Sequence, residues 1–471
     1  MTPDKREHRD HAVVLGAGMA GLLAARVLSE SYEMVTVVER DDLKTAAARS
    51  GVPQGRHIHM FMSSGTQGLE RLFPGIRDEL QTNGATVCDE GDLSRITMLI
   101  GSREIFPRSG KFRDPETLRL YLATRPFLEM HVRQRVQRLD NVKFLDGHDV
   151  IEPMTEGHRV TGVRVARRST GLVTTLISDL VIDATGRTPR TQTFLDRLGY
   201  PRPATVRMES PVTYASQLLH VADDTDMDKL TFFNPAPGRP YGGAIARCEN
   251  GTVMLTLGKF NLDEPPSTFD EMISFAAQFV PERLLDTIRS AVPIGDVHVF
   301  RYREALWRRY DQMEQFPEGL LVMGDAICSL DPIKGQGMTM ALLEAVALRD
   351  CLLEGDAQLA RRYFRTVGRH INTVWQHNKL SAPLFTAMPA DIPLTQRVLW
   401  KLTAWWSDMV MIAARNDIQI TETILRVNNM HDSPLLMRRP AFLLRVLRHC
   451  WRRHDTHVTT APERQLVLAG T

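Results

Sequence analysis

The stretch AVVLGAGMAGLLAARVLSESYEMVTVVER, at residues 12–40, constrains the fold of this chain more than any other feature. Apolar residues at 12–15 predict a short strand, those at 22–28 predict a helix, and the run at 35–38 predicts a second strand. Two strands joined by a helix form the repeating unit of parallel α/β sheets. The N-terminal part of the chain therefore predicts a Rossmann-like layer.

The glycines that follow the first strand indicate what this layer binds. Gly16, Gly18 and Gly21 have the spacing that permits a tight turn, close approach of the backbone to a pyrophosphate, and close helix packing. Glu39 ends the second strand, where a carboxylate can bind ribose hydroxyls. A glycine turn without a ligand is the alternative, but the strand, the helix and the acid all stand where a dinucleotide needs them. We also expect contacts from the neighbouring residues Ala17, Ala20 and Arg40.

A second glycine-rich loop, GDAICSLDPIKGQGM at residues 324–338, follows the apolar run GLLVM and precedes a helical pattern. A loop that opens a helix presents free backbone N–H groups and the positive end of the helix dipole, which stabilise negative charge. Its glycines let a ligand come close to the backbone. The sequence therefore predicts that an anionic group lies against this loop.

Length and composition place both motifs in a globular chain with two lobes. The 471 residues exceed one ordinary domain, and 43% hydrophobic with 24% charged residues is typical of soluble proteins. A net charge of +2 provides no field for nucleic acid, so we expect no nucleic-acid partner. Five scattered cysteines without a CxxC pair indicate neither a disulfide framework nor a zinc site. We therefore expect no metal and a reducing, cytoplasmic location.

Targeting and membrane segments are not expected. The charged beginning MTPDKREHRDH lacks the apolar core of a secretory signal. The most apolar later stretch, at residues 398–414, is interrupted by Lys401 and Asp408, whereas a membrane span needs about 20 mainly apolar residues. The arginine-rich tail LMRRPAFLLRVLRHCWRRH has one apolar helical face, and this pattern favours a helix packed on the body over one that lies on a membrane.

Three separated motifs stand in one order: the glycine unit with Glu39, DLVIDATGRTPR at residues 179–190, and the loop at 324–338. With these motifs, residues 12–371 resemble the FAD-dependent monooxygenases that have a single dinucleotide-binding fold, the aromatic hydroxylase and squalene epoxidase type. Three shorter signatures, GVPQGRHIH, ATRPFLEMHVRQRV and RVNNMHDSPLLMRRP, resemble actinobacterial polyene epoxidases of polyether biosynthesis.

The resemblance implies non-covalent FAD and names the residues that hold it. Asp325 would bind a hydroxyl of the ribityl chain, and Glu39 would bind the adenosine ribose. Arg56 and Arg125 would lie near the phosphates or the flavin, and Val150 would contact adenine through its backbone. The segment Asp183 to Gly186 would contact the nucleotide side. The residues expected along the isoalloxazine are Pro332, Gly335, Gln336, Gly337 and Met338.

Fold and domain boundaries follow from the same patterns. We expect an α/β protein (α+β overall) with a Rossmann-like FAD-binding domain that is discontinuous in sequence, at residues 11–75, 112–190 and 311–380. Alternating segments with Pro and Gly between them predict a mostly antiparallel substrate-binding sheet. We assign residues 76–111 and 191–310 to this sheet domain. Residues 381–471 form the expected helical C-terminal region.

The resemblance further implies a reaction. NAD(P)H would reduce FAD, directly or through a separate flavin reductase, and a flavin C4a-hydroperoxide would transfer one atom of O2 to the substrate. The chemistry belongs to the cofactor, so no acid or base side chain is expected to be indispensable. We expect a large apolar polyketide or polyene whose alkenes are epoxidised in secondary metabolism, as in antibiotic biosynthesis. The side chains expected to line its pocket are Met60, Met62, Phe232, Phe233, Tyr241 and Phe385.

Other functions remain open at this stage. An aromatic hydroxylase of the same family, an isoprenoid-type double-bond flavin reductase and a non-catalytic FAD-binding protein share the same motifs. A flavin halogenase is disfavoured because the WxWxIP motif is absent. His57 and His59 fit no common zinc pattern, which favours a structural hydrogen-bonding role for both. We expect a monomer or a weak dimer.

Overall fold

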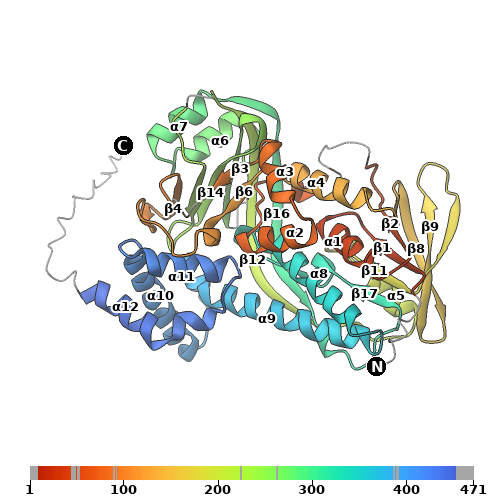
Figure 1. The fold of residues 1–471 in the computed structure, drawn as a ribbon. Helices are drawn as coiled ribbons and strands as arrows, with labels where there is room; N and C mark the ends of the chain where they lie inside the picture. Colours follow the sequence, from red (N-terminus) through yellow and green to blue (C-terminus); the bar gives the residue numbers. More distant parts are fainter. Residues whose placement is uncertain are drawn as a thin grey trace, which may run out of the picture.

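The computed structural model describes residues 9–43, 49, 53–88, 91, 93–222, 225–260, 264–385, 388 and 392–451. Figure 1 shows a parallel sheet with helices packed on it, a long, mostly antiparallel sheet beside it, and a group of helices at the end of the chain. The fold class expected from the sequence is confirmed: the protein is mixed α/β with a helical C-terminal region.

The parallel sheet has five strands in the order β17-β11-β1-β2-β7. Their bounds are Leu320–Val322, Leu180–Asp183, His11–Leu15, Met34–Val38 and Val142–Leu145. β17 pairs with β11 although residues 205–308, which contain most of the second sheet, lie between them in sequence. The Rossmann-like layer is therefore discontinuous, as the returning α/β pattern predicts.

Both faces of this sheet are covered, which explains why its strands are almost continuously apolar. Ala12 and Val14 face the helices, whereas Val13 and Leu15 face the other side and pack with Val160. The helices are α1 (Met19–Leu28), α4 (Arg125–Gln137) and α8 (Gly337–Leu353). The opposite face is covered by the three strands β8 (His148–Glu156), β9 (Arg159–Arg167) and β10 (Val173–Ile177).

The second sheet has eight strands in the order β18-β16-β12-β15-β14-β13-β4-β5. Their bounds are Cys328–Ser329, Val292–Arg308, Thr205–His220, Thr252–Phe260, Tyr241–Arg247, Leu230–Asn234, Ile96–Ile100 and Arg103–Glu104. The pairs are antiparallel except for β13 with β4. One face packs on α6 (Phe269–Ala276) and α7 (Glu282–Arg289), which sequence patterns did not single out.

Two short strands and three helices connect the sheets. β3 (Thr86–Cys88) pairs with β6 (Leu120–Leu122), and α2 (Ser63–Leu72) packs on α8. The remaining helices of this region are α3 (Ile76–Thr82) and α5 (Thr191–Arg197). This connecting region carries the chain from the parallel sheet to the antiparallel sheet and back.

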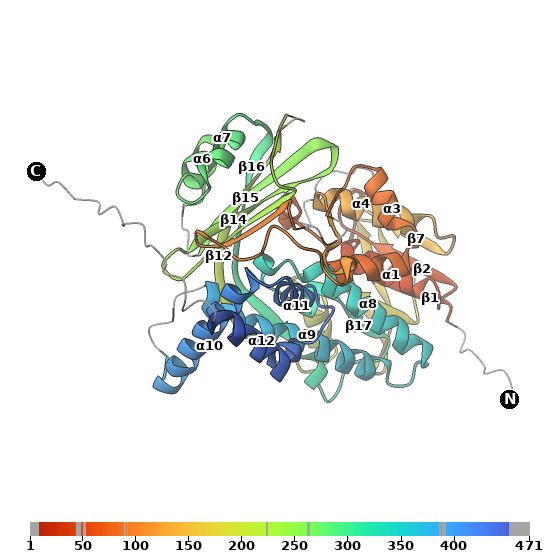
Figure 2. The ribbon, with the colours of Figure 1, turned by 60° about the vertical axis from the view of Figure 1, so that its left-hand side comes forward.

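The C-terminal region is helical and begins with α9 (Leu359–Phe385). In Figure 1 this helix runs from the side of the parallel sheet toward the last helices of the chain. It continues through α10 (Leu394–Ala414), α11 (Ile418–Asn428), the 3-10 helix η7 (Pro434–Arg438) and α12 (Pro440–Trp451). Figure 2 shows α10, α11 and α12 side by side. Phe442 and Val446 of α12 are buried, so this helix packs on the body.

Two further expectations concern membrane-spanning helices and cysteines. None of the helices in the described part of the chain is long and apolar enough to cross a membrane. Among the described residues, Cys248, Cys328 and Cys351 are free and buried, and Cys88 is also buried.

Candidate active site

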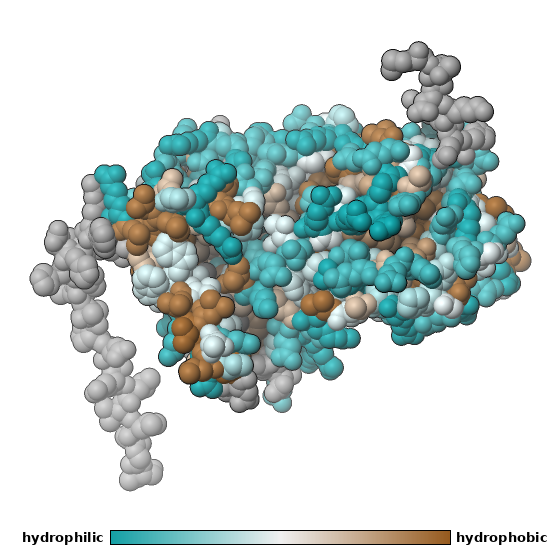
Figure 3. All heavy atoms as spheres, turned by 90° about the horizontal axis from the view of Figure 1, so that it is seen from below, coloured by the Kyte–Doolittle hydropathy of each residue, from teal (hydrophilic) through white to brown (hydrophobic). Residues whose placement is uncertain are grey.

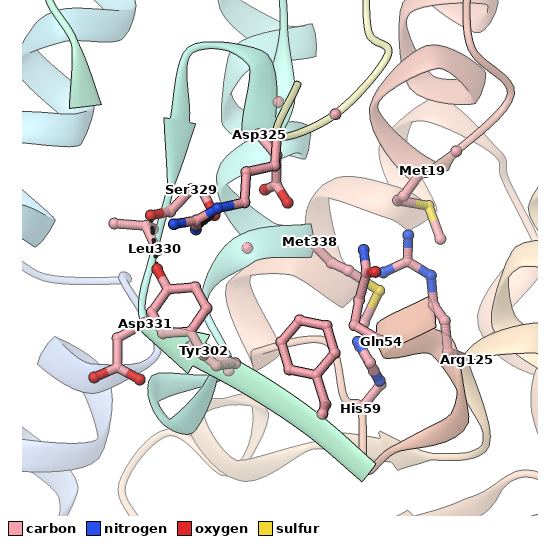
Figure 4. Close-up of a pocket in the computed structure, with 18 of the residues that line it drawn as sticks. Met19, Gln54, His59, Arg125, Tyr302, Asp325, Ser329, Leu330, Asp331 and Met338 are labelled. Atoms are coloured by element: carbon pink, nitrogen blue, oxygen red, sulfur yellow. Dashed lines mark hydrogen bonds between the residues drawn. The ribbon is translucent and has the colours of Figure 1, made fainter. Parts of the chain in front are cut away.

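A cavity of about 820 Å³ lies between the two sheets. At one end its wall is made by the glycine turn after β1, and at the other end by side chains of the antiparallel sheet. The loop after β17 forms part of the wall between these ends. Figure 4 shows Met19 and Arg125 on one side of this space, Asp325 and Ser329 on the other, and Met338 between them.

The glycine turn is shaped by steric limits. Gly16 has φ +100°, and a Cβ there would come within 2.6 Å of the Ala184 carbonyl oxygen. A Cβ on Gly21 would lie 1.8 Å from the Gly16 carbonyl oxygen, so glycine permits α1 to pack against the turn. Gly18 lines the cavity with open space around its Cβ position, and it caps α1 without a side-chain hydrogen bond. The N-terminus of α1 is therefore open to an anion.

Glu39 belongs to a buried ion-pair network beside this turn. Its carboxylate accepts a hydrogen bond from the Ala17 N–H at 2.8 Å and forms an ion pair with Arg49 at 2.9 Å. Arg49 also pairs with Glu129, which in turn pairs with Arg125 at 3.2 Å. Burial lowers the pKa of Arg49, but the two carboxylates outweigh it and raise that pKa above its ordinary value.

Asp325 stands at the end of β17, in the short 3-10 turn η5 (Gly324–Ala326). The Gly324 N–H donates to Glu344 at 2.5 Å and so fixes the turn, and the Asp325 carboxylate points into the cavity (Figure 4). Within the described residues, no donor is hydrogen-bonded to that carboxylate. Burial raises the pKa of Asp325, and three guanidinium groups offset part of the rise: Arg125, Arg187 and Arg308. An unpaired carboxylate in a cavity wall fits a ligand hydroxyl.

The loop before α8 lies between Asp325 and the antiparallel sheet. Gly335 has φ +64°, and a Cβ there would meet the Met62 methyl group at 3.1 Å. Gln336 is held by the Asn378 side chain of α9, which donates to it at 2.9 Å. The loop therefore has a fixed backbone that presents the start of α8 to the cavity, as the second glycine motif predicts.

One face of the antiparallel sheet supplies the far wall of the cavity. The residues of the sheet that line the cavity include Val212, Tyr214, Phe232, Phe260, Phe300 and Tyr302. Tyr302 donates to the Ser329 carbonyl oxygen at 3.0 Å, and Arg187 lies over its ring at 4.9 Å from the centroid. This wall is mainly apolar and aromatic.

A chain of buried hydrogen bonds begins at the cavity wall with Thr256. The Thr256 hydroxyl is 2.7 Å from that of Ser216, which is 2.8 Å from Nδ1 of His57. Thr256 lines the cavity, whereas Ser216 and His57 lie behind it and are buried. Burial, with nearby His59, His298 and Arg56 adding to it, lowers the pKa of His57 to about 3. His57 is therefore neutral near pH 7.

The structure places many of the predicted cofactor and pocket residues in the cavity wall. They are Gly16, Gly18, Ala20, Glu39, Arg40, Arg125, Val150, Gly186, Asp325, Pro332, Gly335, Gly337, Met338, Met60, Phe232 and Phe233. Ala17 and Gly21 lie just behind them, in the turn.

Two predicted cofactor residues are placed elsewhere. Asp183 is fully buried and its carboxylate accepts from the backbone and hydroxyl groups of Thr185 and Thr191, so it organises the turn after β11. Arg56 is exposed, outside the cavity wall, and 3.4 Å from His298. Their sequence positions are close to the motifs, but neither residue lines the cavity.

Four other predicted residues lie outside the cavity wall, each because of its local contacts. Tyr241 lies on the opposite face of the sheet and stacks on Phe279 at 5.2 Å, because strand residues alternate between faces. Phe385 lies under the Lys334 ammonium at 4.0 Å from its ring centroid, outside the wall. Met62 packs against Gly335, and Gln336 bonds to Asn378, so both support the loop from behind.

Arg49 and Arg187 are among the cations of the cavity wall that sequence patterns missed. Arg49 reaches Glu39 and Glu129, and Arg187 donates to Ser329 at 2.8 Å. Arg187 follows Gly186 directly, so the third motif contained a signal for it. Arg49 had no such signal, because its partners come from separate parts of the chain.

Within the described ranges, no group of three or more His, Cys, Asp or Glu side chains is arranged to hold a metal ion.

Sequence comparison places this cavity in a known family. Residues 10–357 match the FAD binding domain family. Protein Rv3254 of Mycobacterium tuberculosis is 33% identical over 460 residues, which cover 94% of each chain. Kynurenine 3-monooxygenase of Salinispora arenicola is 26% identical over 364 residues, which cover 73% of this chain and 72% of the relative.

Solved structures share the fold. The flavin-dependent brominase Bmp2 has a TM-score of 0.63 at 14% identity, covering 95% of this chain and 100% of its own. The p-nitrophenol 4-monooxygenase PnpA of Pseudomonas putida DLL-E4 has a TM-score of 0.62 at 16% identity, and the match covers 91% of this chain and 99% of that protein's chain. At these identities the similarity concerns the fold alone.

The cavity itself fits FAD. The open N-terminus of α1 suits a pyrophosphate, the unpaired Asp325 carboxylate suits a hydroxyl of the ribityl chain, and the glycine loop before α8 suits a planar ring. This fit and the family match over most of the chain agree. The chain therefore belongs to the FAD binding domain family of aromatic-type flavin monooxygenases.

Proposed function

We propose that this flavin-dependent monooxygenase transfers one oxygen atom from O2 to a large, mainly apolar substrate and that it epoxidises carbon–carbon double bonds. The observation that carries the proposal is the continuity of the cavity. One space of about 820 Å³ extends from the glycine turn, past Asp325, to the apolar face of the antiparallel sheet. A substrate on that face would lie next to a flavin ring held by the loop before α8.

Different parts of the cavity wall are proposed to hold different parts of FAD. Gly18 and the N-terminus of α1 would hold the pyrophosphate, Asp325 the ribityl chain, and Gly335 and Gly337 the ring. When bound, FAD supplies the electron transfer and oxygen activation. The protein excludes water with its apolar wall and orients the substrate against the ring.

Electrons are proposed to come from NAD(P)H. The chain has a single GxGxxG unit, so we expect no separate nicotinamide domain. NAD(P)H, or a partner reductase, would reach the flavin from the substrate side of the cavity.

The choice of an alkene follows from the chemistry of the far wall. Phe232, Phe300 and Met60 provide apolar contact, and methionine adapts to a flexible chain. The resemblance of three short signatures to polyene epoxidases points the same way. We therefore propose a polyene or polyketide substrate of secondary metabolism.

Hydroxylation of an activated ring is a second candidate, and a specific observation favours it. The chain Thr256–Ser216–His57 begins at the cavity wall and continues behind it. Such a chain can accept a hydrogen bond from a phenolic hydroxyl at Thr256 and orient the ring toward a bound flavin, whereas the low pKa of His57 makes its imidazole a poor acceptor for the proton itself. Two similar proteins are named for action on aromatic compounds, kynurenine and p-nitrophenol.

One experiment separates these candidates. Purified protein with FAD, NAD(P)H and labelled O2 is given polyene esters and simple phenols in parallel reactions, and the products are analysed by accurate mass. Labelled epoxides from the polyenes support the first proposal. Ring hydroxylation of phenols with unchanged polyenes supports the second candidate. A double bond reduced without oxygen would indicate a reductase, and no product with any donor would indicate a non-catalytic flavoprotein.

The buried free thiols support a cytoplasmic location for this activity. Among the described residues, Cys248, Cys328 and Cys351 are free thiols. We propose that the protein is a monomer or a weak dimer.

A further inference from the structure

The first half of α10 carries a row of apolar side chains on the surface. Four large residues recur at helical spacing and are exposed by 77%, 52%, 56% and 58%: Leu394, Val398, Leu402 and Trp405. Surface helices ordinarily turn such a face toward the core. Within α10 the buried residues belong to the second half, at Val410, Ala413 and Ala414. We call the four exposed residues the apolar stripe.

Two cations border the apolar stripe. Arg397 and Lys401 are one helical turn apart, and on a helix of 3.6 residues per turn both fall along the same edge of the stripe. The one acidic residue of α10, Asp408, is paired with Arg103. The helix therefore presents an apolar face with a positive border.

The neighbouring elements extend this positive surface. η7 and α12 add exposed arginines and exposed leucines, namely Arg438, Arg439, Arg448, Leu435 and Leu444. The acids of residues 394–451 are Asp408, Asp417, Glu422 and Asp432, and each is bound within the protein. Figure 3 shows large hydrophobic side chains gathered at the end of the molecule that carries these helices.

We propose that the apolar stripe and its basic border dock the protein on an anionic lipid surface. Leucine, valine and tryptophan side chains gain by burial at the boundary between headgroups and acyl chains, and tryptophan prefers that boundary. Arg397 and Lys401 would then lie at the level of the lipid phosphates, where each basic residue adds attraction.

A second copy of this chain fits the same surface less well. A two-fold interface pairs a surface with itself, so it would bring the positive border of one copy against that of the other. The surface offers no unbound carboxylate among its described residues to neutralise that border. The charge therefore favours an anionic partner, and the apolar stripe favours a lipid one. This inference does not depend on which substrate the cavity takes.

The test is binding of the full-length, FAD-loaded protein to vesicles in a flotation assay. One set of vesicles contains phosphatidylglycerol and phosphatidylcholine in equal parts, and the other contains phosphatidylcholine alone. We expect the protein to float with the first set, to bind the second set at least tenfold more weakly, and to leave the anionic vesicles as salt rises.

Two variants and one matched control separate the contributions. Val398→Ser combined with Leu402→Ser and Trp405→Ser should abolish flotation, and Arg397→Gln with Lys401→Gln should weaken binding to anionic vesicles by about 30-fold. Leu353→Ser is the control, since Leu353 is 78% exposed at the end of α8, away from this surface. Flavin content and melting temperature verify that each variant is folded.

Three outcomes would overturn the proposal. The first is absence of flotation with anionic vesicles. The second is flotation that the stripe variant leaves unchanged. The third is concentration-dependent dimerisation in sedimentation experiments that the stripe variant abolishes, with no vesicle binding, since the stripe would then contact a second copy.

Discussion

The guanidinium group of Arg49 lies 2.9 Å from the carboxylate of Glu39, and both side chains are buried. Glu39 is the acid that ends β2 in the dinucleotide unit, and Arg49 joins it to Glu129 on α4. The glycine turn, β2 and α4 are thus held by one cation beside the cavity. This arrangement gives the first prediction.

Arg49→Met should destabilise the fold. The change leaves Glu39 and Glu129 buried without their shared cation, and breaking a buried pair costs about 3–5 kcal/mol. Urea unfolding of the flavin-free protein measures the loss. Arg202→Met serves as the control because its ion pair with Asp196 is exposed, and it should leave the midpoint unchanged. Equal midpoints for both variants would contradict a structural role for Arg49.

Asp325→Ala should weaken FAD binding without unfolding the protein. The carboxylate accepts no hydrogen bond from the described residues, so its loss removes a ligand contact rather than an internal one. A hydrogen bond to a charged group is worth about 1.5–3 kcal/mol, or about 10–150-fold in affinity. Flavin fluorescence titration measures the change, with Asp286→Ala on exposed α7 as the control. Unchanged affinity would remove Asp325 from the cofactor site.

His57 should make stability depend on pH. Burial lowers its folded pKa to about 3, below the unfolded value near 6.5, so the unfolded state binds more protons between these values. The contribution of His57 is therefore fully present above about pH 6.5 and is lost as pH falls. Between pH 7.5 and 5.0 the loss should be about 2 kcal/mol.

The comparison that isolates His57 is urea unfolding of wild type and His57→Gln at both pH values. Glutamine can keep a hydrogen bond to Ser216 but does not titrate. The difference between the two proteins should shrink at the lower pH. Parallel pH curves would show that His57 is not held neutral by the fold.

Ser216→Ala tests the second candidate function. The change interrupts the chain between Thr256 and His57 without touching the cavity wall. If the chain orients a phenolic hydroxyl, hydroxylation should slow by about 10-fold while flavin reduction by NAD(P)H keeps its rate. Epoxidation of alkenes, which have no hydroxyl for the chain to hold, should not change. Thr213→Ala is the control, since Thr213 is buried on the opposite face of β12.

Local motifs predicted the parts of the site that depend on neighbours in sequence. The spacing of Gly16 and Gly18 predicted the dinucleotide turn, and the family resemblance assigned Asp325 and Gly335 to the cofactor. The discontinuous parallel sheet followed in the same way from the strand pattern that returns at 319–323.

The remaining residues depend on contacts that spacing does not contain. Tyr241 is one residue from the lining position Gly242, and a shift of one residue moves a side chain to the other face of a strand. Asp183 and Arg49 take their roles from partners brought together by folding. The hydroxyl chain of Thr256 and Ser216 joins two strands whose register only the structure reveals.

The central claim is that the protein incorporates oxygen through bound FAD. The measurement that tests it most directly is the accurate mass of the product formed from a polyene ester with FAD, NAD(P)H and labelled O2. The account predicts one labelled oxygen atom for each molecule of NAD(P)H consumed in forming product, with incorporation strongly reduced in Asp325→Ala. A product that carries oxygen from water, or a product formed equally well without O2, would contradict it.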